Sequence, residues 1–181
     1  DTTLPQADVT ANIITANVIQ TQFSEWVDGA DLTLNYSIDN AMEFLSISHN
    51  VAEQIYEIQT SQMRTITYTV TMNNITDAFG NAVSSAVFYI EGHDHVMPQL
   101  SSFNVTDQSS GSSLYTNARD VNVYIAGSDE GDGVAYILIT ENVSTEPTVS
   151  DFSMTATPSS YTIQSSEGVV ELVVWILDGA N

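Results

Sequence analysis

Residues 65–81, TITYTVTMNNITDAFGN, decide the fold of this chain. In the first half of the stretch, Ile66, Tyr68, Val70 and Met72 alternate with threonines. A period of two places the apolar side chains on one face of an extended backbone and the hydroxyls on the other. The stretch therefore predicts a strand whose apolar face lies on a core.

The second half of the stretch predicts a tight turn. Asp77 and Asn81 bracket Ala78, Phe79 and Gly80. Glycine supplies the left-handed backbone that such a turn needs, and the side-chain oxygens of Asp and Asn can accept hydrogen bonds from its free amides. A second apolar strand runs into a similar turn at residues 169–181, VVELVVWILDGAN. Two copies of one pattern predict two domains of similar build.

The composition favours strands and excludes several classes of function. The chain has 181 residues, 43% of them hydrophobic, and is rich in Thr, Ser, Val, Ile and Tyr, which are typical of β-structure. It has no Lys, Arg64 and Arg119 as its only Arg residues, and a net charge of −21. Nucleic-acid binding needs clustered cations and is therefore excluded, whereas divalent cations are favoured. The absence of Cys excludes disulfides and thiolate metal sites, and no apolar run predicts membrane insertion.

The order of predicted strands gives an all-β fold of two tandem immunoglobulin-like β-sandwich domains. Residues 1–91 form the first domain, residues 92–98 a linker that contains Pro98, and residues 99–181 the second domain. The strands expected in the first domain are residues 7–15, 17–26, 32–38, 44–48, 54–58, 65–72 and 83–90. Those expected in the second are residues 100–106, 120–126, 134–140, 161–164 and 169–177.

The second domain lacks a counterpart of residues 83–90, the closing strand of the first domain. Three explanations stay open. The strand can lie beyond Asn181, which the start of the chain at a linker-like Asp1 favours. A neighbouring copy can donate a strand, with residues 9–19 as the donor, although the first domain needs that strand itself. The domain can also close with fewer strands.

Residues 23–28, FSEWVD, together with Tyr68-Thr69-Val70 and residues 76–81, TDAFGN, resemble the bacterial Ig-like domains of surface-layer proteins and large adhesins. Residues 115–119, 127–129 and 175–178 resemble a second repeat of the same kind. The resemblance implies a structural or adhesive module of an extracellular, cell-surface protein of a microbe. We expect a rigid, acidic spacer or a head-to-tail filament element, whose partners are neighbouring Ig-like domains or copies of itself.

Acidic residues from separate segments are expected to meet at one pole of each sandwich, because the loops after the second and sixth strands lie where the chain enters. Irregular clusters of oxygen ligands suit Ca²⁺, so the sequence predicts calcium that stiffens the linker. The same residues are also ordinary turn residues. The predicted ligands in the second domain and linker are Asp94, Asp129, Glu130, Asp132 and Asp178; those in the first domain are Asp1, Asp28, Asp77 and Asn81, with Glu25 and Asp31 nearby.

The main alternative function is a carbohydrate- or ligand-binding module, for which Trp26 and Trp175 are the candidate contacts. His93 and His95 flank Asp94, but a solvated linker explains them better than a zinc site does. No Ser, His and acid stand in a catalytic array, and no phosphate-binding loop occurs. The sequence therefore predicts that the protein is not an enzyme.

Overall fold

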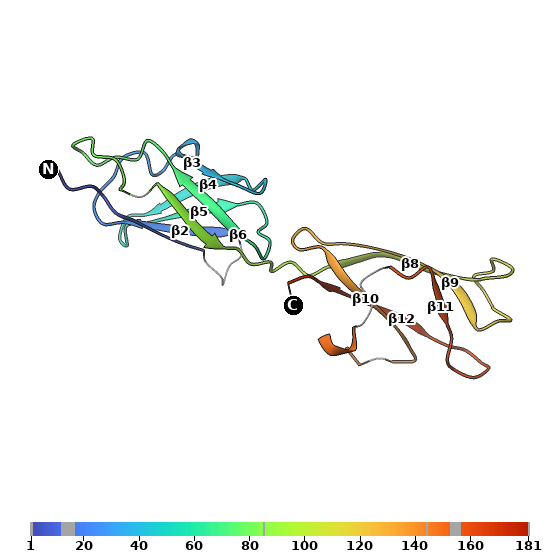
Figure 1. Ribbon diagram of the computed structural model, residues 1–181. Helices are drawn as coiled ribbons and strands as arrows, with labels where there is room; N and C mark the ends of the chain where they lie inside the picture. Colours follow the sequence, from blue (N-terminus) through green and yellow to red (C-terminus); the bar gives the residue numbers. More distant parts are fainter. Residues whose placement is uncertain (1, 12–16, 85, 144, 153–156, 181) are drawn as a thin grey trace. The chain divides into compact units, whose positions relative to one another are not determined.

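The computed structural model describes residues 2–11, 17–84, 86–143, 145–152 and 157–180 (Figure 1). The chain divides into two compact units, residues 1–95 and 96–181. The division falls between His95 and Val96, inside the segment that the sequence marks as a linker. Each unit is built from antiparallel strands, which confirms the predicted all-β fold.

The first unit is a sandwich of two antiparallel sheets. One sheet has the order β1-β2-β5-β4 and the other β3-β6-β7, which is the strand arrangement of a constant-type immunoglobulin domain. Its strands are β1 (Ala7–Ala11), β2 (Val18–Phe23), β3 (Tyr36–Ile38), β4 (Phe44–Asn50), β5 (Ile55–Thr60), β6 (Thr67–Met72) and β7 (Val87–Glu91).

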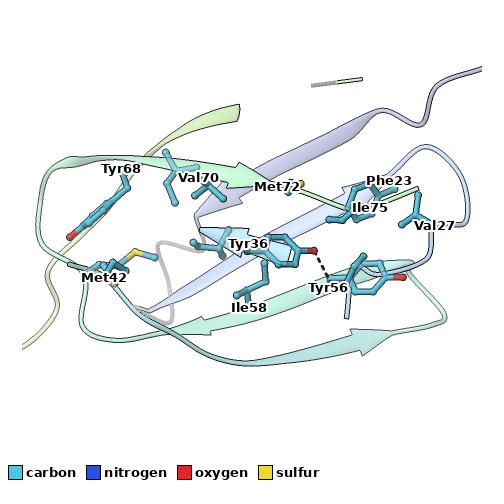
Figure 2. Close-up of a cluster of buried hydrophobic side chains, with 14 residues drawn as sticks. Phe23, Val27, Tyr36, Met42, Tyr56, Ile58, Tyr68, Val70, Met72 and Ile75 are labelled. Atoms are coloured by element: carbon cyan, nitrogen blue, oxygen red, sulfur yellow. Dashed lines mark hydrogen bonds between the residues drawn. The ribbon is translucent and has the colours of Figure 1, made fainter. Parts of the chain in front are cut away.

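The core of the first unit lies on the predicted face of β6. Tyr68, Val70 and Met72 are buried, while the threonines between them are exposed or half-buried. Figure 2 shows these side chains packed with Phe23, Tyr56 and other residues of the facing sheet. Fourteen buried hydrophobic residues of the described ranges form this cluster, so the alternation in residues 65–72 correctly located the centre of the fold.

The predicted strand at residues 32–38 is wrong in its first half. Thr33–Asn35 forms a 3-10 turn, and β3 begins only at Tyr36. The Nδ2 atom of Asn35 donates to the backbone oxygen of Gly29 at 2.9 Å, and Asn35 is buried. This hydrogen bond folds the chain back on itself where an extended backbone was expected.

The second unit also has two sheets, of order β11-β9-β8 and β10-β12. Its strands are β8 (Gln99–Asp107), β9 (Asp120–Ser128), β10 (Val134–Glu141), β11 (Ser160–Thr162) and β12 (Leu172–Asp178), with a 3-10 turn at Val149–Asp151. Among its described residues, the unit has no counterpart of either β4 or β7. In the described part of this unit, the core cluster contains three buried residues, Val121, Val123 and Ile139, surrounded by half-buried ones.

Candidate metal and ligand sites

The predicted calcium ligand Asp77 is a structural residue of its own turn. Its Oδ1 atom accepts from the backbone amides of Phe79 and Asn81, each at 2.8 Å, and its Oδ2 atom accepts from Nδ2 of Asn81 at 2.7 Å. Burial opposes ionisation of this carboxyl, which is 3% exposed, but the hydrogen bonds from Asn81, Phe79 and Gly80 outweigh it and lower the pKa of Asp77. Both oxygens therefore already have protein partners.

A second predicted ligand, Asp28, lies beside this turn. The backbones of Asp28 and Thr76 form a bridge, with the amide of Asp28 donating to Thr76 at 2.7 Å. Asp28 therefore follows β2 at the same pole as Asp77. Burial, aided by the negative charge of Asp31, raises the pKa values of Tyr36 and Tyr56. Asp1 lies outside the described residues.

In the second unit, Asp129 closes the loop between β9 and β10. Its Oδ1 atom accepts from the amides of Gly131 and Gly133, at 2.7 and 3.1 Å. Its Oδ2 atom is buried and has no hydrogen-bond partner. A buried carboxylate oxygen without a partner is uncommon, because the lost hydration is not replaced.

The end of β12 lies against this loop. Asp178 is opposite Val134 in the sheet, and the amide of Gly179 donates to the backbone oxygen of Gly133 at 3.2 Å. A Cβ added at Gly179 would lie 3.4 Å from the Cβ of Asp132. Asp129, Asp132 and Asp178 are thus at one pole of the second unit, while Glu130 is exposed beside them.

Asp94 belongs to the first unit, where its Oδ1 atom accepts from Nε2 of Gln62 at 3.1 Å. The rings of His93 and His95 are 6.3 Å apart and tilted. Nowhere in the described part of the chain do three or more His, Asp or Glu side chains form a group able to hold a metal ion. Any cation would therefore also need ligands other than these side chains.

The two candidate aromatic contacts differ in their surroundings. Trp26 is 56% exposed, and its ring lies 5.8 Å from that of His49, which stacks on Tyr56 at 4.0 Å. Trp175 is half-buried on β12 and its indole N–H donates to Oγ1 of Thr140 at 2.9 Å. Trp26 thus offers an open aromatic surface, and Trp175 is held in its sheet.

Two adjoining hollows open at the end of the second unit away from Asp129. One, of about 470 Å³, is lined by core residues of β8, β9 and β12 and by the loops at residues 112–116 and 168–170. The other, of about 530 Å³, is lined mainly by polar residues and by Arg119. They share Thr116, Ile163, Gly168 and Val170. Neither hollow was predicted from the sequence.

Two further carboxylates with many partners were missed by sequence reasoning. Asp107 is buried and accepts from Ser109, Ser110 and Thr116 at 2.6–3.0 Å, and hydrogen bonds from Ser109 and Thr116 in particular lower its pKa. Glu141 accepts from Tyr161, Gln164 and Ser165. The Asp-x-Ser-Ser sequence at residues 107–110 was a usable signal, since Asp commonly caps such turns. Glu141 has no local signal, because its partners are about 20 residues away.

No protein-family model matches the chain, and no curated protein does. Among solved structures, it is similar to the N-terminal part of the bacterial S-layer protein SbsC, with 14% identity and a TM-score of 0.44, over 96% of this chain and 41% of that one. A structure of domains 1–6 of surface layer protein SbsC gives 13% identity and a TM-score of 0.43, over 98% and 33% of the two chains. The chain thus spans less than half the length of these proteins.

None of the short helical segments in the described ranges has the length and apolar character that crossing a bilayer requires.

Proposed function

We propose that this chain is a non-catalytic structural module of an extracellular microbial surface protein, a rigid acidic spacer or filament element. What supports the proposal is the combination of two β-sandwich units with a net charge of −21. The resemblance of residues 23–28 and 76–81 to Ig-like domains of surface-layer proteins and adhesins supports the cell-surface location.

We further propose that calcium binds at the Asp129 pole of the second unit. The observation that carries this proposal is the Oδ2 atom of Asp129, which is buried and has no hydrogen-bond partner. A cation would replace the hydration that this oxygen has lost. The Asp129 carboxylate would supply the first ligand, and backbone carbonyls, other side-chain oxygens of the loop or water the remainder, since Ca²⁺ takes about 6–8 oxygen ligands.

The test compares thermal unfolding of the full chain in millimolar Ca²⁺ and in chelator at equal ionic strength. A ligand that binds only the folded state, at a hundredfold excess over its Kd, stabilises it by about 2.7 kcal/mol. Asp129→Asn should abolish the calcium-dependent shift. Glu146→Gln, which removes one exposed acid from the same unit, should preserve it. Identical curves with and without calcium would refute the site.

The exposed ring of Trp26 favours carbohydrate binding as a second candidate function. Its 56% exposure above His49 and Tyr56 offers the apolar face that can stack on a sugar ring. A glycan array probed with the full chain tests this function. Binding that Trp26→Ala abolishes and that Trp175→Phe leaves intact would support it, and an array without any bound glycan would exclude it.

A further inference from the structure

Four Asn-x-Ser/Thr sequences occur in the chain, at Asn35, Asn74, Asn104 and Asn142. This sequence is the acceptor of N-linked glycosylation in proteins that leave the cytoplasm. Because the chain is rich in Ser and Thr, such sequences also arise in it by chance. The structural surroundings of each Asn therefore decide whether a glycan can be carried there.

The folded chain already uses the side chains of two of these residues. Asn35 is 3% exposed and its Nδ2 atom donates to the backbone oxygen of Gly29, so the fold leaves no space for a sugar on this nitrogen. At Asn142, the Nδ2 atom donates to Oγ of Ser165 at 3.3 Å and the Oδ1 atom accepts from the amide of Glu171 at 3.0 Å. A glycan at either position would disturb contacts that hold the fold.

The side chain of Asn104 has the opposite surroundings. Asn104 is exposed within β8, and the residues before and after it, Phe103 and Val105, pack on the core of the second unit. The alternation of the strand therefore directs Asn104 away from the core. Among the described strands, β8 is at the edge of its sheet (Figure 1), so the backbone around Asn104 is open on one side.

An aromatic ring lies directly across the sheet from Asn104. Tyr124 on β9 is the antiparallel partner of Asn104 and is 57% exposed. The Cβ atoms of directly opposed residues are about 4.5–5.5 Å apart, and their side chains project from the same face. The flanking residues on this face have small or polar side chains: Ser102 and Thr106 on β8, and Ala126 and Asn122 on β9. The ring of Tyr124 is therefore open to a group attached at Asn104.

We propose that Asn104 is N-glycosylated and that the apolar face of the first sugar packs on the ring of Tyr124. The co-substrate is an oligosaccharide linked to a lipid pyrophosphate. The Nδ2 atom of Asn104 forms a bond to the anomeric carbon while the bond from that carbon to the phosphate oxygen breaks. The amide gives one proton to a base of the transferase, and the lipid pyrophosphate leaves with the bonding electron pair. The step is a group transfer without oxidation or reduction.

Cleavage on the N-terminal side of each Asp tests the proposal, because it puts the four sequences in separate peptides: residues 31–38, 39–76, 94–106 and 132–150. The sample is the full chain isolated from the cells that make it. Mass spectrometry should find peptide 94–106 heavier by the mass of a glycan that fragmentation places on Asn104, and peptides 31–38 and 132–150 unmodified. A bare peptide 94–106, or a glycan on peptide 31–38, would overturn the proposal.

The proposal rests on the extracellular location in the proposed function, so antibody labelling of intact and lysed cells measures that location separately. A chain that is labelled on intact cells and has a bare peptide 94–106 would overturn the glycosylation alone. A chain that is labelled only after lysis would overturn the location as well.

Thermal unfolding of the full chain tests the contact with Tyr124. Asn104→Gln removes the glycan and should lower the melting temperature of the second unit by about 4 °C, because the packing of the sugar on the ring is lost. In the Tyr124→Ala variant, Asn104→Gln should have less than half of this effect. Tyr115→Ala, which removes another exposed tyrosine of the same unit, is the matched control and should preserve the full shift. Equal shifts in the two tyrosine variants would overturn the contact.

Discussion

At the scale of single residues, Glu141 connects the two sheets of the second unit. It ends β10, whereas Tyr161, which donates to it at 3.0 Å, lies on β11 of the other sheet. The amides of Gln164 and Ser165 donate to the same carboxylate at 2.6 and 2.8 Å. Burial opposes ionisation, but hydrogen bonds from Ser165, Gln164 and Tyr161 outweigh it and lower the pKa of Glu141 to about 2.

This pKa predicts how the stability of the second unit depends on pH. A carboxyl whose pKa is lower in the folded state stabilises the fold above its unfolded pKa of about 4.3, and the contribution is lost as the pH falls towards 2. Glu141→Gln should therefore cost about 2 kcal/mol at pH 6, and clearly less at pH 3. Denaturant unfolding at both pH values measures the difference. Glu146→Gln is the matched control, and a cost for Glu141→Gln that is equal at both pH values would contradict the prediction.

The chemistry of single aspartate side chains explains why the predicted metal ligands could not be distinguished from turn residues in the sequence. A carboxylate followed by Gly and Asn uses the same oxygens to accept backbone amides as to bind a cation. In Asp77 both oxygens have protein partners, whereas in Asp129 one oxygen is buried without a hydrogen bond. Only the three-dimensional arrangement of the loop separates the two cases.

At the scale of elements, period-two alternation located β6 and its buried face, because burial on one side of a sheet imposes that pattern on the sequence. Residues 32–38 alternate as well, yet Thr33–Asn35 forms a 3-10 turn, in which the side chain of the buried Asn35 donates a hydrogen bond to Gly29. A contact between two loop residues leaves no periodic signal.

Substitution of two glycines, Gly29 and Gly80, measures how tightly the loops around Asp28 and Asp77 in the first unit are packed. Gly29 and Gly80 have φ values of 85° and 86°, so replacement by Ala strains both backbones alike. A Cβ at Gly29 would lie 2.7 Å from the backbone oxygen of Asn74, whereas a Cβ at Gly80 would meet nothing within 4 Å. We expect Gly80→Ala to cost about 1 kcal/mol and Gly29→Ala about 3 kcal/mol, because overpacking adds to the strain.

Chemical denaturation of the first unit, followed through Trp26, gives both costs. Equal costs for the two glycine variants would show that the loop at residues 28–31 moves away from Asn74 without penalty.

At the scale of the whole molecule, the two units have unequal cores. Among the described residues, the first has fourteen buried residues in its cluster, including Ile19, Ile58 and Tyr68, and the second has three. Burial of apolar surface is the main term that stabilises a fold, so the second unit should unfold first. The hollow of about 470 Å³ points the same way, because it leaves apolar side chains of the second unit in contact with water.

Calorimetry of the full chain should therefore show two transitions, with the second unit melting at the lower temperature. Ile139→Val removes a methylene from the smaller core and should cost about 1 kcal/mol, which moves only the lower transition, by about 4–8 °C for a unit of this size. Ile58→Val makes the same change in the larger core and should move only the upper transition. Because the paired variants differ in location and not in chemistry, they assign each transition to its unit. A single transition that both variants shift would instead show that the two units unfold together.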